Sequence, residues 1–443
     1  MKVLFITNDY IIDPLAIAYL SSYLKKQGHT VDLIKAKQEN IYTKIEEYNP
    51  DVLAYSVTTG MHVYFKDLNS SIKNTFPNLI TIVGGAHITF FPDYVKSDGI
   101  DYGIAGEGFE AFPELLHCLE VGDNPTGIPN IVTKTFNGKL RPLYNKDLLL
   151  LPDRDLIYKY PINRDNPIKN IMTSFGCPFS CPYCYNEKYK KIYDIKMPQQ
   201  RSVENVIAEV EDLKRFPLEL IFFQDDLFPI YNKKWITEFC DKYPKVPFHI
   251  QVRLEMITDG VIKQLKSAGL FSVTFAIETG DETLRRDVLN RNMTNSIIFE
   301  KVKILQQNDI KYRSENMIGI PNETIQSALK TLDLNIKIKP TIGWASNFQP
   351  YPGTALGDQC FSASIFDNDI DSISSSFFEE YILKVAHNKE FNRLQKLFPI
   401  IVDKPYLRFL TRLLILLPFD KFYGKLFSFY KKYLYNEKLY KVN

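Results

Sequence analysis

The sequence predicts an α/β protein built from an N-terminal doubly wound (Rossmann-like) domain, a partial (β/α)6 barrel and a helical C-terminal segment. Three observations lead to this prediction. Short apolar runs alternate with amphipathic helical stretches along residues 1–124, and the alternation returns along residues 168–358. Residues 125–167, between them, are rich in proline, asparagine and aspartate. In residues 359–443 the alternation stops, so we expect two domains, a linker and a helical C-terminal region.

The composition excludes several classes of protein. The chain has 443 residues, of which 45% are hydrophobic and 24% charged, and a net charge of +2. The chain is therefore long enough to bury large cores. Its near-neutral charge gives no sign of the basic surface that a nucleic-acid-binding protein needs. The chain has six cysteines, no apolar leader behind a basic start and no run of 18 apolar residues. This combination fits neither a secreted disulfide scaffold nor a membrane-spanning protein. We therefore expect reduced thiols and a cytoplasmic location.

The first domain is predicted to be a parallel sheet with helices on both faces. Such a sheet binds ligands beyond the C-terminal ends of its strands. The expected strands are residues 2–7, 29–35, 51–57, 79–85 and 101–106. The expected helices are residues 14–28, 41–50, 62–77, 88–99 and 110–122. The residues at the ligand-binding strand ends are Thr7 to Asp9, Ser56 to Thr59, Gly84 to His87 and Gly106 to Gly108.

The linker contains a segment that resembles a β-ribbon. NIVTKTFNGKLRPLY (130–144) has strand-forming residues on both sides of an Asn-Gly pair. We therefore predict a small hairpin that turns at Asn137-Gly138.

The second alternation supplies six strand-helix units, which suffice for an open or partial barrel. Active-site groups of such a barrel gather at the C-terminal ends of the strands. The expected strands are residues 170–176, 218–226, 248–254, 271–280, 311–321 and 342–350.

Three cysteines follow the first barrel strand in the segment CPFSCPYC, at Cys177, Cys181 and Cys184. Three thiolates can hold three irons of a 4Fe-4S cube and leave the fourth iron open, whereas a structural zinc site is normally closed by four protein ligands. No second CxxC and no histidine pair lies nearby, and we interpret the other cysteines as small buried hydrophobic side chains. These isolated cysteines are Cys118, Cys240 and Cys360. The pattern therefore favours an iron-sulfur cluster with an open position.

The CxxxCxxC motif, with Tyr183 before its last cysteine, resembles the signature of the radical S-adenosylmethionine (SAM) superfamily. The resemblance covers residues 168–355. It includes FFQDD, VTFAIETGDE, MIGIPNET and QPYPGT at the ends of the second, fourth, fifth and sixth strands. It implies a radical SAM barrel in which the open iron binds SAM and one electron splits the sulfonium. The resulting 5'-deoxyadenosyl radical abstracts hydrogen from the substrate.

The same resemblance implies SAM-binding roles for residues at the strand ends, with Tyr183 beside the cofactor. Asp225 and Asp226 are expected near the methionine amine, and Arg253 near the methionine carboxylate. Glu278 is expected near polar groups of the methionine or the ribose. Without the resemblance, the three carboxylates suit helix N-caps equally well. We favour the SAM site because the residues occur in order at successive strand ends.

The N-terminal domain resembles the cobalamin-binding domain that precedes many radical SAM domains, through the segments SVTTG, IVGGAHITFFPD and GIAGEGFEAFPEL. No GxGxxG follows the first strand, so a dinucleotide is not expected. Glycines in these segments would let the nucleotide tail of cobalamin approach the backbone. The cofactor-binding residues that the resemblance implies are Ser56, Thr58, Gly84, Gly85, His87, Gly106 and Glu107.

The N-terminal domain departs from the mutase-type cobalamin-binding pattern in one respect. No DxHxxG motif supplies a histidine to the lower face of cobalt, since His29 lacks the preceding aspartate and His87 lies too far along the chain. We therefore expect cobalamin bound without a protein imidazole. The alternative is a domain that has kept the fold and lost the cofactor, because a fold alone does not choose its ligand.

Residues 391–443 contain 11 basic side chains, eight lysines and three arginines, against three acidic ones, and many Leu, Phe and Tyr. One interpretation is a helical cap packed over the barrel mouth. The other is a basic amphipathic surface that touches an anionic membrane or holds a lipid-like substrate. The sequence does not choose between them.

Together, the motifs predict a cobalamin-dependent radical SAM methyltransferase that acts on an unactivated carbon of a small-molecule or lipid-like substrate. The alternatives are a cobalamin-associated radical cyclase or rearrangement enzyme and, from another class, a non-catalytic iron-sulfur or zinc binding module. The implied cofactors are a 4Fe-4S cluster, SAM and cobalamin, and the implied partner is an electron donor such as flavodoxin or ferredoxin. We expect a cytoplasmic protein, peripheral to the inner face of the membrane if its C-terminal segment binds lipid. The sequence assigns no catalytic acid or base.

Overall fold

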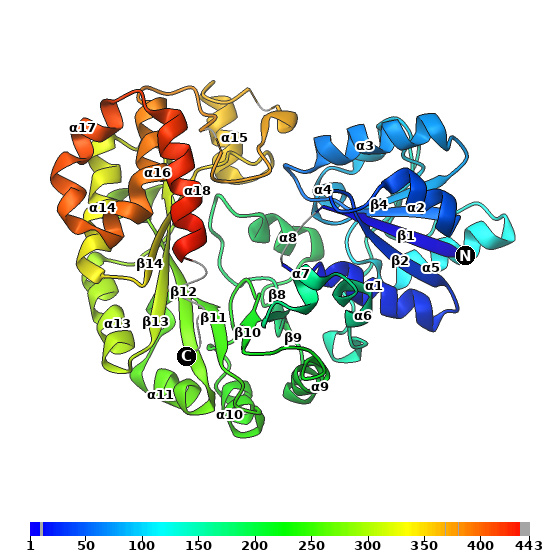
Figure 1. Cartoon of the computed structure of the whole chain (residues 1–443), viewed down its shortest axis with the longest axis horizontal. Helices are drawn as coiled ribbons and strands as arrows, with labels where there is room; N and C mark the ends of the chain where they lie inside the picture. The colour runs from blue at the N-terminus through cyan, green and yellow to red at the C-terminus, as the bar shows by residue number, and fades with distance from the viewer. Residues whose placement is uncertain (9–11, 368, 380, 435–443) are drawn as a thin grey trace. The chain divides into compact units, whose positions relative to one another are not determined.

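The chain folds into two compact units, and each contains one large sheet (Figure 1). The computed structural model describes residues 1–8, 12–367, 369–379 and 381–434. Unit 1 consists of residues 1–170 and 208–218, and unit 2 of residues 171–207 and 219–443. The predicted fold class is confirmed: a doubly wound α/β unit, then a partial barrel of parallel strands, then helices.

Unit 1 has a sheet with the strand order β2-β1-β3-β4-β5-β6. Its strands are β1 (Lys2–Thr7), β2 (Thr30–Lys35), β3 (Val52–Ser56), β4 (Ile80–Gly84), β5 (Tyr102–Ile104) and β6 (Ile131–Val132). Its helices are α1 (Leu15–Lys26), α2 (Ile41–Tyr48), α3 (His62–Thr75), α4 (Ala86–Phe90), α5 (Gly108–Val121), α6 (Arg154–Tyr158) and α7 (Pro161–Arg164). The first five strands pair in parallel, and β6 is antiparallel to β5. Because the strand order reverses between β1 and β3, the ends of these strands form the expected ligand crevice.

Two local predictions for unit 1 differ from the structure. The helix expected over residues 88–99 is divided into α4 and a 3-10 helix over Pro92–Lys96, because Pro92 cannot donate the backbone hydrogen bond that would continue α4. The hairpin turns earlier than Asn137-Gly138. Thr133 N donates to Phe136 O over 2.7 Å, and Gly138 N donates to Ile131 O over 2.8 Å, which places the turn at residues 134 and 135.

Unit 2 has a sheet with the strand order β14-β13-β12-β11-β10-β7. Its strands are β7 (Ile168–Ile171), β10 (Leu220–Phe223), β11 (Phe248–Val252), β12 (Leu270–Glu278), β13 (Lys311–Ile318) and β14 (Ile342–Asn347). The connecting helices are α8 (Tyr185–Tyr193), α9 (Val203–Leu213), α10 (Lys233–Lys242), α11 (Asp259–Ala268), α12 (Glu282–Asp287), α13 (Asn295–Gln307) and α14 (Ile325–Ile338). Residues 168–170 of β7 and 208–213 of α9 belong to unit 1. The pairs from β10 to β14 are parallel, so their C-terminal ends meet at one edge.

The first strand of the barrel is shorter than the predicted range 170–176. β7 ends at Ile171, and β8 (Ser174–Phe175) pairs separately with β9 (Gln199–Gln200). The reason is a side chain: the Asp225 carboxylate accepts hydrogen bonds from the backbone N–H groups of Thr173 and Ser174 over 2.6 and 2.9 Å. These amides are therefore directed away from the β7 ladder.

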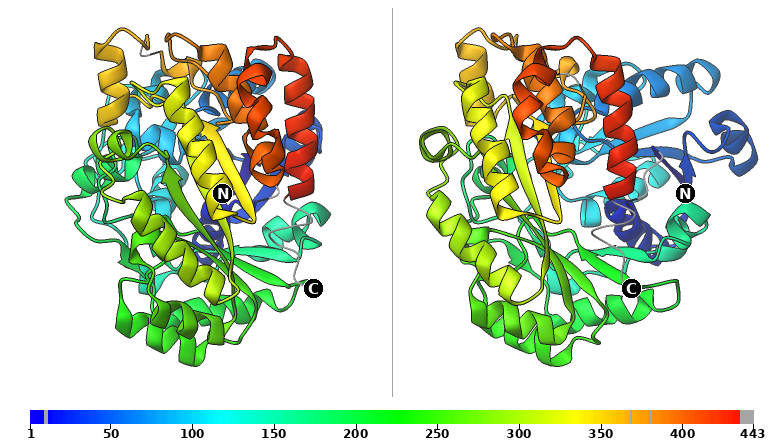
Figure 2. Two further views of the ribbon diagram at one scale, coloured as in Figure 1. Left: turned by 90° about the vertical axis from the view of Figure 1, so that its left-hand side faces the viewer. Right: turned by 60° about the vertical axis from the view of Figure 1, so that its left-hand side comes forward.

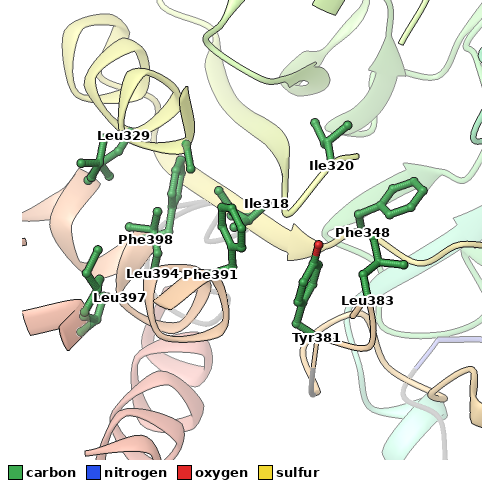
Figure 3. Packing of buried hydrophobic residues seen from close by; sticks show 14 of the residues in the cluster. Ile318, Ile320, Leu329, Phe348, Tyr381, Leu383, Phe391, Leu394, Leu397 and Phe398 are labelled. Atoms are coloured by element: carbon green, nitrogen blue, oxygen red, sulfur yellow. The ribbon is translucent and has the colours of Figure 1, made fainter. Parts of the chain in front are cut away.

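The C-terminal region is helical, with α15 (Ala355–Ser362), α16 (Asn388–Asp403), α17 (Thr411–Leu416) and α18 (Asp420–Leu434). α16 and α18, drawn in orange and red, lie next to the last strand of the sheet (Figure 2). Figure 3 shows Phe391, Leu394 and Phe398 of α16 gathered near Ile318 of β13, and these side chains are buried in one hydrophobic cluster. α16 therefore packs against the barrel through a shared hydrophobic core.

α16 and α18 contact opposite faces of β14. A Cβ atom at Gly343 would lie 2.7 Å from Val402 Cγ1 of α16. The next residue, Trp344, points to the other face, where its ring centroid lies 5.4 Å from that of Phe427 in α18. Successive side chains of a strand alternate between faces, so the two helices enclose this edge strand.

Candidate functional site

The three cysteines of unit 2 lie on one loop between β8 and α8. All three are free thiols and partly exposed. Cys184 N donates to Cys181 O over 3.0 Å, and Cys184 Sγ accepts from Asn186 N over 3.5 Å at the start of α8. Burial raises the pKa of Cys177, and raises that of Cys184 to about 12, with a further contribution from the negative charge of Asp226. Bound metal deprotonates such thiols outright, so the loop is chemically suited to ligate iron.

The thiols do not form a site for a single metal ion. Within the described ranges of the chain, no three Cys, His, Asp or Glu side chains converge as ligands of one ion would. A zinc site requires such convergence, whereas a 4Fe-4S cube takes one thiolate on each of three irons. The donor set therefore fits a cluster.

Arg253 lies beside the cysteine loop. It follows β11, its guanidinium carbon is 4.1 Å from the ring centroid of Phe179, and its Nη1 is 3.5 Å from Cys181 Sγ. It also forms an ion pair with Glu255. Burial opposes ionisation of Glu255, but Arg253 holds the pKa of that carboxyl below its usual value. The predicted cation is therefore next to the loop, and Glu255 is a partner that the sequence analysis missed.

Glu278 is hydrogen-bonded to the cysteine loop and to Arg291, a second residue that the sequence analysis missed. Its Oε1 accepts a hydrogen bond from Tyr183 Oη over 2.8 Å and from Arg291 Nη1 over 3.0 Å. Arg291 also donates to Ala276 O over 2.6 Å. Glu278 has a φ of +68° at the end of β12, which turns its side chain out of the strand's alternation. The structure thus brings Tyr183 and Glu278 together, as the predicted site requires.

Asp225 and Asp226, both predicted to lie near the methionine amine, have different environments. Asp225 is fully buried, and its oxygens accept from Thr173 N, Thr173 Oγ1 and Ser174 N. Burial raises the pKa of Asp225 to about 7. Asp225 therefore shapes the segment leading to the cysteine loop and has no surface with which to contact SAM. Asp226 is more exposed, but burial of its carboxyl raises its pKa, and hydrogen bonds from the Asn186 side chain and the Gly176 backbone act in the opposite direction.

In unit 1 the two glycines at the end of β4 differ in the space around them. A Cβ at Gly84 would make ordinary contacts, 3.8 Å from Ile104 O and 3.9 Å from Tyr55 O. A Cβ at Gly85 would lie 2.7 Å from Val57 O, and Gly85 has a φ of +97°. Gly85 is therefore required by the close approach of the segment that follows β3, whereas Gly84 would accept a Cβ in ordinary van der Waals contact.

The other predicted residues of unit 1 lie at the same edge of the sheet. His87 is buried, 3.1 Å from Thr59 Oγ1 through Nδ1, and its ring stacks on that of His62 with centroids 4.2 Å apart. Ser56 is partly buried, Thr58 is exposed, and Gly106 N donates to Thr89 Oγ1 over 2.8 Å.

The carboxylate of Glu107, a residue predicted to bind cofactor, contacts the linker. Its Oε1 pairs with the fully buried ammonium of Lys146, and its Oε2 accepts from Tyr144 N over 2.6 Å. It anchors the linker to unit 1. His29 contacts the N-terminal amino group over 3.2 Å, at the opposite edge of the sheet from the strand C-terminal ends.

Family models match both units. Residues 1–116 match the B12 binding domain, and residues 171–334 match the radical SAM superfamily. The protein is a radical SAM enzyme with a B12-binding domain. Membership of the radical SAM superfamily implies SAM and a 4Fe-4S cluster, and the B12-binding domain implies cobalamin.

Relatives of the radical SAM enzyme carry out more than one reaction. The chain is 27% identical over 371 residues to an uncharacterized methyltransferase of Pyrococcus horikoshii, covering 80% of this chain and 79% of the relative. It is 26% identical to the anaerobic magnesium-protoporphyrin IX monomethyl ester cyclase of Cereibacter sphaeroides, covering 77% and 59%. It is 28% identical to the hopanoid C-3 methylase of Methylococcus capsulatus, covering 49% and 42%.

A solved structure has the same fold as the radical SAM enzyme. The radical SAM methyltransferase TsrM from Kitasatospora setae, bound to tryptophan and a SAM analogue, superposes with a TM-score of 0.68 at 17% identity. The match covers 81% of this chain and 76% of TsrM. The two chains therefore share one fold over most of their length.

Arg291, Glu255 and His62 are the site residues that sequence reasoning missed. Arg291 lies 13 residues after its partner Glu278 and belongs to no motif. The signal that could have indicated it is physical: a buried carboxylate at a strand end needs a cation or hydrogen-bond donors.

Proposed function

We propose that the protein methylates an unactivated carbon of a small-molecule or lipid-like substrate. When bound, the cluster and SAM supply a hydrogen-abstracting radical, and cobalamin supplies the methyl group. The observation that carries the proposal is the succession of a B12-binding domain and a radical SAM barrel in one chain. The names of two relatives, an uncharacterized methyltransferase and a hopanoid methylase, support methyl transfer.

The residues of unit 2 suggest a division of roles. We assign Cys177, Cys181 and Cys184 to the cluster. Arg253, next to the cysteine loop, supplies a cation for the SAM carboxylate, and Asp226 supplies an exposed anion for the amine. The Tyr183–Glu278–Arg291 group holds the loop against β12, which excludes water from one side of the site.

The residues of unit 1 suggest how cobalamin is held. Gly84 at the end of β4 presents no side chain, and Ser56, Thr58, Gly106 and His87 lie at the same edge. We assign the nucleotide tail of cobalamin to this crevice. Because Nδ1 of His87 contacts Thr59 and its ring is stacked on His62, we do not assign His87 as a ligand of cobalt.

Anaerobic reconstitution with iron, sulfide, SAM, a reductant and hydroxocobalamin tests the proposal. We expect about four irons per chain, and both 5'-deoxyadenosine and S-adenosylhomocysteine by mass spectrometry, because SAM is both the radical source and the methyl source. Cys181→Ala should abolish iron binding and SAM cleavage. Cys240→Ala, which changes an isolated thiol on α10, is the matched control and should retain both.

A cyclase or rearrangement enzyme is the second candidate, because the chain is similar to a magnesium-protoporphyrin cyclase over 77% of its length. This reaction predicts 5'-deoxyadenosine without S-adenosylhomocysteine. A binding module would release neither product. Stoichiometric zinc and no iron in the anaerobically purified protein would contradict both enzymatic proposals.

Two further partners belong to the proposal. An electron donor such as flavodoxin or ferredoxin would reduce the cluster, and the C-terminal segment would make peripheral contact with the inner face of the membrane from a cytoplasmic location. In the part of the chain that the structure describes, no helix has the length and apolar character needed to cross a membrane. The contact we propose is therefore interfacial, and the exposed aromatic side chains of the C-terminal helices support it.

A further inference from the structure

Helix α18 has one face fixed to the barrel. Tyr423, Phe427 and Leu434 are buried, and the Phe427 ring lies 5.4 Å from Trp344 and 5.7 Å from Phe378, measured between centroids. Tyr430 Oη donates to Asp403 of α16. These contacts fix the rotation of α18 about its own axis, so its opposite face is set by the fold.

The opposite face of α18 carries aromatic side chains in a row. Phe422 and Phe429 are 60% and 73% exposed, and Tyr433 is 42% exposed. Phe422 and Phe429 are seven residues apart, and Tyr433 follows Phe429 by four, so the three lie on one side of the helix. Large aromatic side chains exposed together indicate an interaction surface. Phe419, in the turn before α18, is 52% exposed and adds to the apolar surface at the N-terminal end of the helix.

A row of lysines runs beside the aromatic row. Lys421, Lys425 and Lys432 are exposed, and Lys425 lies three residues after Phe422 and four before Phe429. Over residues 404–434 there are seven basic side chains and one acidic side chain, Asp420, and Asp420 is paired with Arg393 over 2.8 Å. Over its described residues, the outer face of α18 is therefore basic.

We propose that this outer face of α18 docks on an anionic lipid bilayer, with Phe422 and Phe429 among the lipid headgroups and acyl boundary and the lysine row on the phosphates. The inference deepens the membrane contact under the proposed function but does not depend on methyl transfer. Aromatic side chains next to lysines on one helix are the arrangement that interfacial helices use. The charge complementarity favours anionic lipid over a neutral surface, because each basic residue near an anionic membrane adds to its attraction.

Vesicle binding of the full-length protein tests this surface. The protein should sediment with vesicles of phosphatidylcholine mixed with phosphatidylglycerol, bind those of phosphatidylcholine alone more weakly, and be released as salt rises. Phe422→Ser with Phe429→Ser, and separately Lys425→Glu with Lys432→Glu, should each lower the partition coefficient about tenfold or more. The matched control changes Phe299 and Lys303 of α13, also exposed and four residues apart, to Ser and Glu, and should bind as the unchanged protein does.

SAM cleavage in solution separates this inference from the proposed reaction. The α18 variants should form 5'-deoxyadenosine at the rate of the unchanged protein, because the substituted side chains point away from the barrel. Equal vesicle binding by the α18 variants and the α13 control would overturn the inference. The inference would also be overturned if the protein binds no vesicles but self-associates, and Phe422→Ser with Phe429→Ser abolishes that self-association. The surface would then contact a second copy of this chain.

Discussion

Tyr183 donates a hydrogen bond to Glu278 over 2.8 Å, although 95 residues separate them. The bond joins the cysteine loop to the end of β12. Arg291 completes the group by pairing with Glu278 over 3.0 Å. The cysteine loop is therefore held by a side chain from another strand, and this attachment can be tested without any cofactor.

Glu278→Gln should destabilise the fold more than Tyr183→Phe does. The Arg291 and Glu278 side chains are 3% and 10% exposed, so loss of the carboxylate leaves a buried guanidinium without a counter-charge. We expect a loss of about 3–5 kcal/mol in the free energy of unfolding for Glu278→Gln, and of about 1 kcal/mol for Tyr183→Phe, which removes one hydrogen bond. Denaturant unfolding measures both. Equal stability of the two variants would show that the ion pair is not what holds the loop.

Gly84 and Gly85 should respond differently to an added methyl group. Gly85→Ala places a Cβ 2.7 Å from the Val57 carbonyl at a φ of +97°, so we expect a loss of about 1–3 kcal/mol. Gly84→Ala should change the stability by less than about 1 kcal/mol. Gly84→Leu should leave the unit folded and fill the crevice, so that hydroxocobalamin is lost on gel filtration. Retention of cobalamin by folded Gly84→Leu would remove this position from the cobalamin site.

Glu323 should make unfolding stability depend on pH. Its Oε2 accepts from Gly319 N over 2.6 Å, and burial raises its pKa from 4.5 to about 8. Between these values the folded chain holds a proton that the unfolded chain releases, so stability should fall as the pH rises from 4.5 to about 8. Glu323→Gln cannot titrate and should flatten this part of the profile. Urea unfolding between pH 5 and 8 compares the two slopes, and identical slopes would contradict the prediction.

Phe398 and Phe429 distinguish the two roles of the C-terminal helices. Phe398 of α16 is fully buried, whereas Phe429 of α18 is 73% exposed. We expect Phe398→Ala to cost about 3–5 kcal/mol through the cavity that it leaves, and Phe429→Ala to change stability by less than about 0.5 kcal/mol. Thermal and denaturant unfolding provide the measurement. A large cost at Phe429 would mean that this ring packs against the fold rather than facing a partner.

Elements with a local signal were predictable. The strand β1 at Lys2–Thr7 and the strand β13, which begins at Lys311, start where the sequence pattern predicts, because alternation between apolar runs and helical periodicity is a property of neighbouring residues. The cysteine motif is local too. The prediction of one helix over residues 88–99 was wrong because Pro92 interrupts it. The sequence contains this break, but the helical spacing of the neighbouring residues concealed it.

The sequence by itself determined the two α/β units, the helical C-terminal region and the loop with three cysteines, since each depends on residues close together in the chain. Only the tertiary structure decided that Asp225 is buried, that Arg291 pairs with Glu278, and that α16 and α18 take opposite faces of β14. The physical reason is that burial and ion pairing depend on which distant segments meet. A carboxylate at a strand end has the same sequence signal whether it faces a cofactor, a cation or the protein's own backbone.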